Sequence, residues 1–236
     1  MTLIVGNWKM NGLRGSLAEL GKMLDGAEAA RKDGRHIVIC PPATLLAAFS
    51  EACRDTDVQT GGQDCHTEPS GAHTGDLSAD MLSDAGATYC IVGHSEVRAA
   101  RVETDEILRA KVEAVLRVGM VPIFCVGESL DERQSLKAEE VVNRQLDVVA
   151  NKADRVIVAY EPIWAIGTGL TPKIEDIAAM HATMHAKVGA KTPLLYGGSV
   201  KPNNAVDILS IDHVGGVLVG GASLLAKDFL MIARAG

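Results

Sequence analysis

The sequence has few aromatic residues and no long apolar run. Phenylalanine, tryptophan and tyrosine make up 3% of the 236 residues. No stretch reaches about 18 apolar residues, so we expect no membrane-spanning helix. Residues 1–7 also lack the basic region and the small-residue cleavage site of a signal peptide. The core must therefore be aliphatic, as it is around buried parallel strands.

Cysteine pairs and basic patches are missing as well. The cysteines are Cys40, Cys53, Cys65, Cys90 and Cys125, an odd number without a Cys-x-x-Cys pair. Reduced thiols in a cytoplasmic protein are the simplest interpretation. The formal net charge is -7, and the Lys and Arg residues are scattered. We therefore expect no nucleic-acid partner, although local groups can still bind an anion.

Short apolar runs alternate with helical patterns along the whole chain. The runs expected to form strands are residues 3–5, 37–40, 57–60, 89–92, 121–126, 156–159, 194–196 and 217–219. Helices are expected at 16–31, from 41 onward, at 78–85, 103–118, within 131–150, and at 174–188, 203–209 and 222–233. Strands that alternate with helices imply crossover connections and a parallel sheet.

Eight such units favour a closed (β/α)8 barrel, with eight parallel strands and outer helices, as a single domain over residues 1–236. A doubly wound open sheet is the alternative, but it normally has fewer units. No linker or change in composition divides the chain. In a barrel of this kind, the active site lies at the C-terminal ends of the strands.

Polar residues and glycines directly follow several of the predicted strands. They are Asn7, Lys9, His94, Glu128, Glu161, Gly197-Gly198-Ser199 and Gly220-Gly221. Each has an ordinary explanation when taken alone: a salt-bridged carboxylate for Glu161, a structural histidine for His94 and a solvated lysine for Lys9. Together on one rim, they indicate a base, a polarising group and a cation around one ligand.

The stretch after the sixth predicted strand suggests a base beside a cover. Pro162 favours an extended backbone at Glu161, where the strand ends. The loop that follows is apolar at its start and rich in glycine at its end. We interpret residues 165–169 as a closing cover and residues 162–164 as its near hinge.

The two glycine pairs favour a phosphate ligand. Gly197 and Gly198 precede Ser199, and Gly220 and Gly221 precede the last predicted helix. Glycine lets a backbone approach an anion closely, and free amides at a helix start bind phosphate. Ordinary turns between strand and helix also use glycine. The turns after strands seven and eight of such barrels are, however, a recurrent phosphate site.

No metal motif is evident. His181 and His185 are four residues apart, but the Glu of a His-Glu-x-x-His motif and a third ligand are missing. We therefore expect these two histidines on a surface helix, with Met180 and Met184 on its buried face.

Five motifs together resemble the triosephosphate isomerase family. They are GNWKMN (6–11), VGHSE (92–96), AYEPIWAIGTG (159–169), YGGSV (196–200) and VGGASL (219–224). The motifs occur in the family's order and span nearly the whole chain, and the third is highly specific. The resemblance implies a TIM barrel that interconverts dihydroxyacetone phosphate and D-glyceraldehyde 3-phosphate in glycolysis and gluconeogenesis, without cofactor or metal.

The resemblance also implies a role for each catalytic residue. Glu161 would be the base that moves a proton between neighbouring carbons. His94 would polarise the carbonyl as an imidazole that stays neutral well below pH 7, and Lys9 would stabilise anionic charge. Asn7 and Glu96 would support these groups.

The same resemblance places the substrate phosphate. Its expected contacts are Asn7, Lys9, Gly167, Ser199, Gly220 and Gly221. The far hinge of the cover, Leu170-Thr171-Pro172, departs from the common pattern, and Pro172 would stiffen it because proline fixes φ.

A homodimer is implied too. The loop from Cys65 to Gly75 would dock on the neighbouring subunit, with Thr74 near the partner's site. His73 stands where the family usually has an aromatic residue, and Val97 replaces a usual arginine. Two other functions stay open from the residues alone: a Schiff-base aldolase that uses Lys9, and a non-catalytic phosphate-binding barrel.

Overall fold

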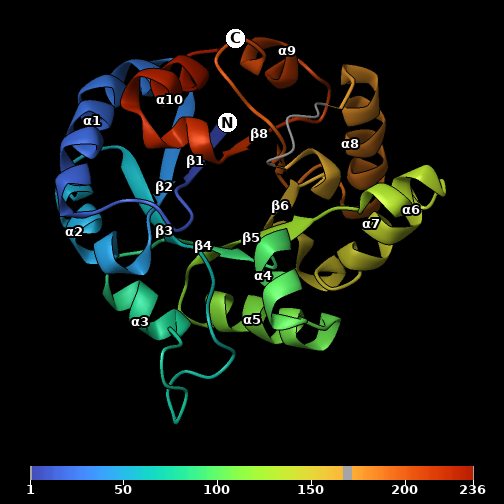
Figure 1. Cartoon of the computed structure of the whole chain (residues 1–236), viewed down its shortest axis with the longest axis horizontal. Coiled ribbons are helices and arrows are strands. Elements are labelled where there is room, and N and C mark those ends of the chain that lie inside the picture. The colour runs from blue at the N-terminus through green and yellow to red at the C-terminus, as the bar shows by residue number, and fades with distance from the viewer. Residues whose placement is uncertain (1, 167–171, 236) are drawn as a thin grey trace.

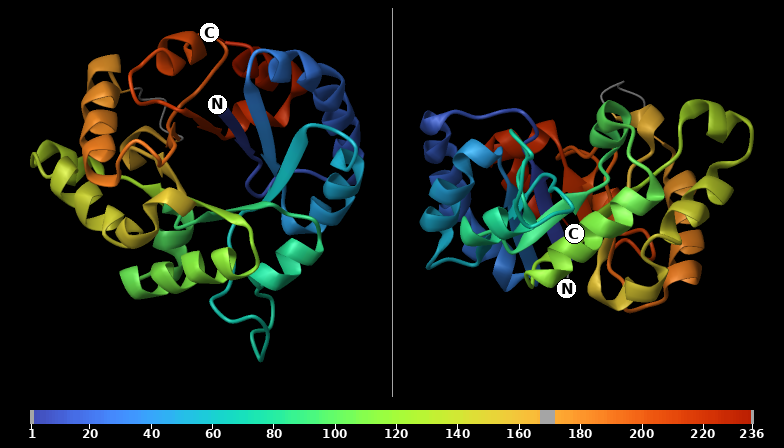
Figure 2. Two further views of the ribbon diagram at one scale, coloured as in Figure 1. Left: turned by 180° about the vertical axis from the view of Figure 1, so that it is seen from behind. Right: turned by 90° about the horizontal axis from the view of Figure 1, so that it is seen from below.

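The computed structural model describes residues 2–166 and 172–235. Its eight parallel strands pair in chain order, and β8 pairs back with β1, so the sheet is a closed barrel. Helices surround the strands (Figures 1 and 2). The predicted (β/α)8 fold is confirmed. None of the described helices is both long and apolar enough to cross a membrane.

The strands and helices lie close to the expected positions. The strands are β1 (Thr2–Asn7), β2 (Arg35–Cys40), β3 (Val58–Gly62), β4 (Tyr89–Val92), β5 (Val121–Val126), β6 (Ile157–Tyr160), β7 (Leu194–Tyr196) and β8 (Gly216–Val219). The α-helices are α1 (Leu17–Lys32), α2 (Ala43–Cys53), α3 (Ala79–Asp84), α4 (Ser95–Arg101), α5 (Asp105–Arg117), α6 (Leu130–Gln134), α7 (Ala138–Leu146), α8 (Ile174–Val188), α9 (Ala205–Leu209) and α10 (Ala226–Ala233). Short 3-10 helices span Arg14–Ser16, Ala150–Arg155, Ile163–Ala165 and Gly221–Leu224.

Two regions hold more helices than expected. The region after β4 was predicted to hold one helix at 103–118, but α4 precedes α5 there. Val102 ends α4 in the left-handed conformation, with φ 51. Thr104 then caps α5 by accepting a hydrogen bond from the N–H of Ile107 at 3.4 Å. The region 131–150 is likewise divided into α6 and α7, with Leu136 at φ 58 between them.

The core has two layers because side chains of a strand alternate between its two faces. In β1, Leu3 and Val5 belong to the cluster that fills the barrel interior, and Ile4 belongs to the cluster between strands and helices. Both clusters are largely aliphatic, as the composition predicts. All five cysteines are free and buried, so they serve as small apolar side chains here.

Helix α8 corrects one prediction. Met180 and Met184 are buried as expected, but His181 is buried as well, with 0% exposure. Its ring stands edge-on to Tyr160, with centroids 6.1 Å apart. Burial lowers the pKa of His181 to about 4. The expected surface position is therefore wrong for His181, because the helix turns this residue toward the barrel.

The barrel closes where β8 meets β1, and Gly216 allows the close approach. Its φ is +153, and a Cβ atom there would lie 1.9 Å from the carbonyl oxygen of Leu3. We expect Gly216→Ala to lower the free energy of unfolding by at least about 2 kcal/mol, through strain and overpacking. Urea denaturation measures the change.

Gly21 provides the control for this substitution. It lies in the middle of α1, and a Cβ atom there would meet nothing within 4 Å. We expect Gly21→Ala to stabilise the protein by about 0.5–1 kcal/mol, because alanine favours the helix. Equal effects of the two substitutions would contradict this account of barrel closure.

Candidate active site

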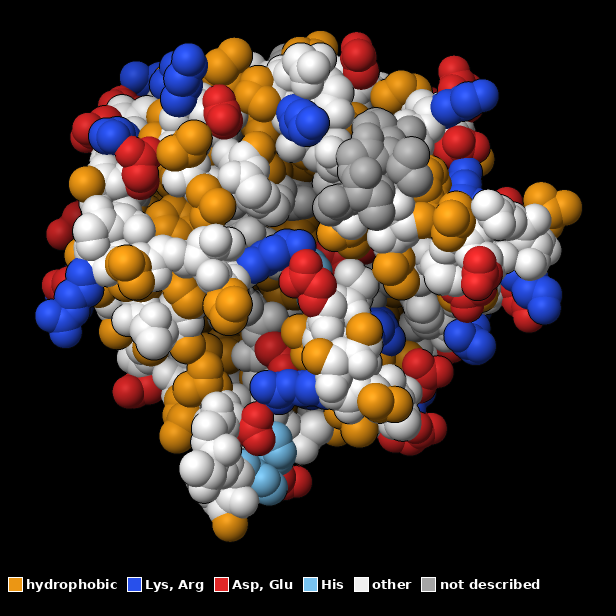
Figure 3. All heavy atoms as spheres, in the orientation of Figure 1, with side chains coloured by type: hydrophobic (Ala, Val, Ile, Leu, Met, Phe, Trp, Pro, Cys, Tyr) orange, Lys and Arg blue, Asp and Glu red, His pale blue; other side chains and the backbone are white. Residues whose placement is uncertain are grey.

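A cavity of about 770 Å³ opens at the C-terminal ends of the strands. Seven of the predicted site residues line it: Asn7, Lys9, His94, Glu161, Ser199, Gly220 and Gly221. The cavity lies on the face seen in Figure 3, where basic and acidic side chains meet near the centre. Gly167, which was also predicted, lies outside the described residues. Residues 168–169 of the predicted cover and residues 170–171 of its predicted far hinge also lie outside the described residues.

Lys9 lines the cavity and has an unusual backbone conformation. Its φ is 52, a conformation that costs a non-glycine residue of order 1–3 kcal/mol. The side chain of Asn7 accepts a hydrogen bond from the N–H of Lys9 at 3.0 Å. Gln63 donates to the carbonyls of Lys9 and Cys40, both at 2.9 Å. These bonds hold the turn after β1 and direct the lysine toward the cavity.

Glu96 is the predicted site residue that stands behind the cavity. Its carboxylate oxygen Oε1 lies 2.5 Å from Nζ of Lys9, and its Oε2 lies 3.8 Å from Nδ1 of His94. The Glu96 side chain is 55% exposed. Glu96 thus forms an ion pair with Lys9, and its expected supporting role stays a prediction.

His94 is placed by the turn after β4. Gly93 has φ 71, and His94 is the N-cap residue of α4. The N–H of Glu96 donates to Nδ1 of His94 at 3.3 Å. When the imidazole is neutral, its proton therefore sits on Nε2. That nitrogen lies 3.0 Å from Oε1 of Glu161.

The pKa of His94 results from two opposing influences. Burial lowers it, but the charge and hydrogen bonding of Glu161 raise it, and the pKa lies above its ordinary value. The expectation of a neutral imidazole well below pH 7 is therefore wrong for this arrangement. The sequence placed both residues on one rim, but it did not show that the carboxylate would contact the ring.

Glu161 is a buried carboxylate, with 2% exposure. Besides its contact with His94, it accepts a hydrogen bond from the N–H of Ser95 at 3.3 Å. Glycines at the ends of two other strands make room for it. A Cβ atom at Gly127 would lie 1.8 Å from the carbonyl oxygen of Glu161, and one at Gly197 would lie 2.8 Å from its Cγ.

The segment after Glu161 is held in place by the buried side chain of Glu128. The sequence predicted Glu128 at the rim but indicated no role for it. Glu128 is fully buried and accepts hydrogen bonds from Trp164 at 2.9 Å and from Tyr160 at 3.1 Å. The guanidinium of Arg133 lies 5.1 Å from the ring centroid of Trp164. These contacts hold the 3-10 helix Ile163–Ala165, which overlaps residues 162–164, where the near hinge was predicted.

The opposite wall of the cavity consists of backbone. Gly220 precedes the 3-10 helix Gly221–Leu224, whose first N–H groups have no partner within the helix. A Cβ atom at Gly220 would lie 3.6 Å from Cε of Lys9, so the lysine reaches this wall. Asn204 orders the neighbouring turn by donating to the carbonyl of Ser199 at 3.0 Å. Such a wall suits an anion.

Several lining residues were not predicted. They are Asn11, Val200, Lys201, Pro202, Asn203, Leu218, Ala222 and Asp228, whereas Ala165 and Ile166 belong to the predicted cover and Gly197 and Gly198 to a predicted phosphate turn. Val200 and Ala222 directly adjoin the predicted residues Ser199 and Gly221, and that proximity is the signal that would have found them. Gln63 does not line the cavity, but it holds the turn at Lys9. It follows β3, two strands away from Lys9 in the barrel, so the sequence gives no signal of this contact.

A buried carboxylate, an imidazole and a lysine thus face one cavity with a wall of backbone that suits an anion. This arrangement suits an enzyme that moves a proton beside a carbonyl of a small anionic substrate, because the donors lie where negative charge would develop. The site and the (β/α)8 fold together define the class as a barrel enzyme acting on small phosphorylated compounds.

The comparisons with known proteins agree with this class. A family model described as triosephosphate isomerase matches residues 2–236. The triosephosphate isomerase of Afipia carboxidovorans is 53% identical over 244 residues, covering 99% of this chain and 96% of the relative. That of Rhizobium etli is 48% identical, covering 99% and 95%. The crystal structure of triosephosphate isomerase from Bartonella henselae matches with TM-score 0.90 and 45% identity, covering 98% of this chain and 97% of that one. The chain belongs to the triosephosphate isomerase family.

The contact between Glu161 and His94 leads to a testable pKa difference. In Glu161→Gln the carboxylate that raises the pKa is lost, while burial, which lowers it, remains. We therefore expect the pKa of His94 to fall. Titration of the imidazole nitrogens by NMR in both proteins measures the shift.

Glu96→Gln is the control for this titration. The Glu96 carboxylate is the more exposed of the two and lies 3.8 Å from the ring of His94. We expect the pKa of His94 to fall less in this variant than in Glu161→Gln. An unchanged pKa in Glu161→Gln would show that the carboxylate does not control the imidazole.

Proposed function

We propose that this chain catalyses the reversible conversion of dihydroxyacetone phosphate and D-glyceraldehyde 3-phosphate. The observation that carries the proposal is the meeting of Glu161, His94 and Lys9 around one cavity with a backbone wall suited to phosphate. Relatives that match nearly the whole chain have this activity in their name, which supports the same substrates for this protein.

Glu161 would act as the base. Removing a proton beside a carbonyl places negative charge on the carbonyl oxygen, where Nε2–H of His94 and the ammonium group of Lys9 would stabilise it. One such preorganised donor contributes about 3–4 kcal/mol, and a positioned base contributes about 10²–10⁴ in rate. Glu161 would then return the proton to the neighbouring carbon, so no cofactor is consumed.

Substrate binding would first separate Glu161 from His94. In the structure, the two groups contact each other at 3.0 Å, so neither is free to act on a substrate. Moving the carboxylate toward the substrate carbon would release Nε2–H for the carbonyl oxygen. It would also remove the main interaction that raises the pKa of His94, and so favour the neutral imidazole that donates a hydrogen bond.

The phosphate would bind at the backbone wall. Ser199, Gly220 and Gly221 line this side of the cavity, and Lys9 lies beside Gly220. Backbone N–H groups at a helix start bind phosphate well, and the lysine would add a positive charge. Asn7 would hold the lysine in position, and Gly167 stays a predicted contact. This binding anchors a substrate that has few other groups to recognise.

The aldolase alternative has less support. A lysine that forms a Schiff base must be a free amine. Nζ of Lys9 lies 2.5 Å from a carboxylate oxygen of Glu96, so it is held in an ion pair and is not free to attack a carbonyl. A non-catalytic phosphate-binding barrel would not explain why a carboxylate is buried beside the imidazole. The isomerase therefore accounts for more of the site.

We also propose a homodimer. The loop that contains residues 65–75 projects from the barrel between β3 and α3 (Figure 1). Thr74 is exposed on it. Large apolar side chains are also exposed on the connection between β1 and α1, with Met10 at 96% and Leu13 at 81%. Exposed apolar surface of this kind marks a protein contact. The dimer would cover it and place Thr74 near the partner's site.

The cytoplasm is the proposed location of this enzyme. All five cysteines are free and buried, which suits a reducing compartment. An isomerase of triose phosphates also works where glycolysis takes place.

The proposed base can be tested with a coupled assay on D-glyceraldehyde 3-phosphate. We expect Glu161→Gln to lower kcat at least about 100-fold, because the amide cannot accept the proton, while a substrate analogue still binds. Glu175→Gln, on the exposed surface of α8, is the matched control and should keep normal turnover. Near-normal turnover in Glu161→Gln would remove this residue from the mechanism.

The proposed dimer can be tested by sedimentation. We expect the native chain to sediment as a dimer, and Thr74→Glu to shift it toward monomers with lower activity, because a buried unpaired charge is costly. Glu175→Gln should sediment like the native chain. A monomeric native chain with full activity would refute the dimer.

A further inference from the structure

Arg133 lies outside the cavity but is connected to the segment that carries the proposed base. It belongs to α6 and does not line the cavity. Its Nη1 lies 3.3 Å from Oε1 of Glu128, and its Nη2 lies 2.8 Å from Oδ1 of Asp176 on α8. We propose that Arg133, held by Asp176, is a positioning residue that keeps Glu161 aligned for proton transfer. This inference rests on the proposed function, in which Glu161 is the base.

The buried carboxylate of Glu128 gives Arg133 its importance. The side chain is fully buried, and removing a carboxylate from water is unfavourable by itself. Its Oε1 accepts hydrogen bonds from Tyr160 and Trp164, but within the described part of the chain its Oε2 has no hydrogen-bond partner. The guanidinium of Arg133, whose side chain is 24% exposed, supplies the opposite charge while it keeps contact with water.

Glu128 in turn holds the chain that follows the base. Its side chain binds the indole of Trp164 at 2.9 Å, and its carbonyl accepts a hydrogen bond from the N–H of Ile163 at 3.1 Å. The N–H of Glu161 itself donates to the carbonyl of Val126 at 2.7 Å. The base and the segment after it are therefore bound to the end of β5, and a shift of Glu128 would move them.

The position of the base leaves little tolerance for such a shift. Oε1 of Glu161 lies 3.0 Å from Nε2 of His94, and a Cβ atom at Gly127 would lie 1.8 Å from the carbonyl oxygen of Glu161. A misplacement of about 1 Å can lower a rate by about 10²-fold. Loss of Arg133 should therefore slow the reaction. The backbone wall suited to phosphate follows β7 and β8, away from this contact.

The first turn of α6 fixes the backbone of Arg133. α6 begins with a capping box, in which the side chains of Ser129 and Glu132 bind each other's backbone N–H groups. The N–H of Arg133 donates to the carbonyl of Ser129 at 3.0 Å. The side chain therefore extends from an ordered, capped helix, as a positioning residue requires.

Two further contacts fix the guanidinium. It lies over the ring of Trp164, 5.1 Å from the ring centroid, and it pairs with Asp176 near the start of α8. Asp176 belongs to none of the five sequence motifs, so the motifs did not indicate this ion pair. Arg133 thus joins α6 and α8 to the segment that follows Glu161.

The test compares turnover with anion binding in Arg133→Gln. We expect kcat in the coupled assay to fall about tenfold, because the base is misplaced. The Kd of inorganic phosphate, measured by calorimetry, should stay the same, because Arg133 does not contact the backbone wall. Asp176→Asn should lower kcat less, since the contact with Glu128 remains. Arg133→Lys should keep more turnover than Arg133→Gln, because lysine retains the charge but not the planar fork.

A double-mutant comparison shows whether Arg133 acts through Glu128. In a Glu128→Gln background, we expect Arg133→Gln to cause little further loss of kcat, because the charge that it balances is gone. A repeated tenfold loss would show that Arg133 acts by another route. The indole N–H signal of Trp164 in an NMR spectrum provides a second measurement. Trp164→Phe assigns this signal, because the chain has two tryptophans, and the signal should move in Arg133→Gln.

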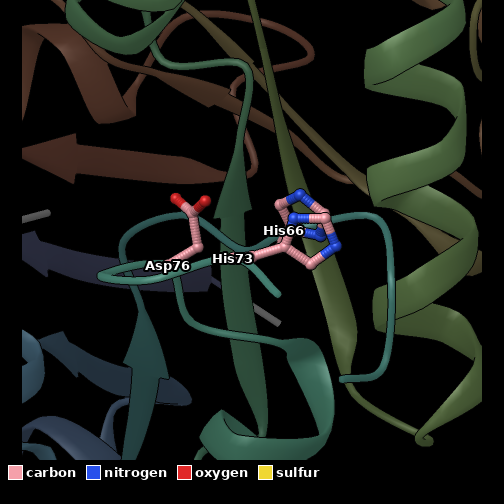
Figure 4. A group of neighbouring side chains, drawn as sticks. All are labelled: His66, His73 and Asp76. Carbon is pink, nitrogen blue, oxygen red and sulfur yellow. The ribbon is translucent and has the colours of Figure 1, made fainter. Parts of the chain in front are cut away.

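The matched control is an arginine that pairs with an aspartate elsewhere. Nη2 of Arg117 lies 2.6 Å from Oδ2 of Asp80, and neither residue lines the cavity. Arg101 is less suitable, because its partner Asp76 lies beside two histidines on the projecting loop that the proposed dimer would cover (Figure 4). Arg117→Gln should keep the native kcat and leave the indole signal of the native chain unchanged.

Native turnover in Arg133→Gln, or a rise in the Kd of phosphate that matches the loss of kcat, would overturn the proposal. Far-UV circular dichroism shows whether each variant is folded. If Arg133→Gln does not fold, the surface variant Asp176→Asn decides, and native kcat with an unmoved indole signal would refute the link. A native chain without isomerase activity would instead refute the proposed function. The indole signal would still report whether Arg133 holds Trp164.

Discussion

The contact between Glu161 and His94 is the interaction on which the rest of the site depends. A buried carboxylate is unfavourable by several kcal/mol unless other groups compensate for the lost water. Here the compensation comes from the imidazole and from the N–H of Ser95, which lie after β4, whereas Glu161 follows β6. The carboxylate is therefore stable only if β4, β5 and β6 keep their parallel register. The barrel provides that register and the glycines provide the space.

The same dependence on the barrel explains the strained lysine. The positive φ of Lys9 is unfavourable by itself, but Asn7 accepts a hydrogen bond from its N–H and Gln63 donates one to its carbonyl. Gln63 follows β3 and also binds the carbonyl of Cys40 after β2. Hydrogen bonds among the ends of β1, β2 and β3 thus stabilise this one turn. Rigid strand ends allow a charged side chain to be presented in a fixed direction, as electrostatic catalysis requires.

The projecting loop after β3 differs from this rigid rim. It is held by a few backbone bonds at its base, and its polar side chains are exposed or half-buried. Its proposed role in subunit contact involves residues that do not line the cavity of the same chain. The loop is therefore separate from the strand ends that line the cavity, and the proposed subunit contact belongs to the loop.

The sequence by itself determined the barrel and predicted much of the cavity lining, because Asn7, Lys9, His94 and Glu161 lie at or soon after the ends of apolar strands, and the strand ends of a parallel barrel meet. Placing Glu161, His94 and Lys9 together needed only the order of the strands. Tertiary structure decided the features that depend on distances between remote segments. These include the inward turn of His181, the bridge made by Gln63 and the role of Glu128 beneath Trp164. Breaks such as Val102, where a β-branched residue is left-handed, also lie beyond local preference. The raised pKa of His94 also depends on tertiary structure. It arises from the contact of His94 with Glu161, which lies 67 residues further along the chain.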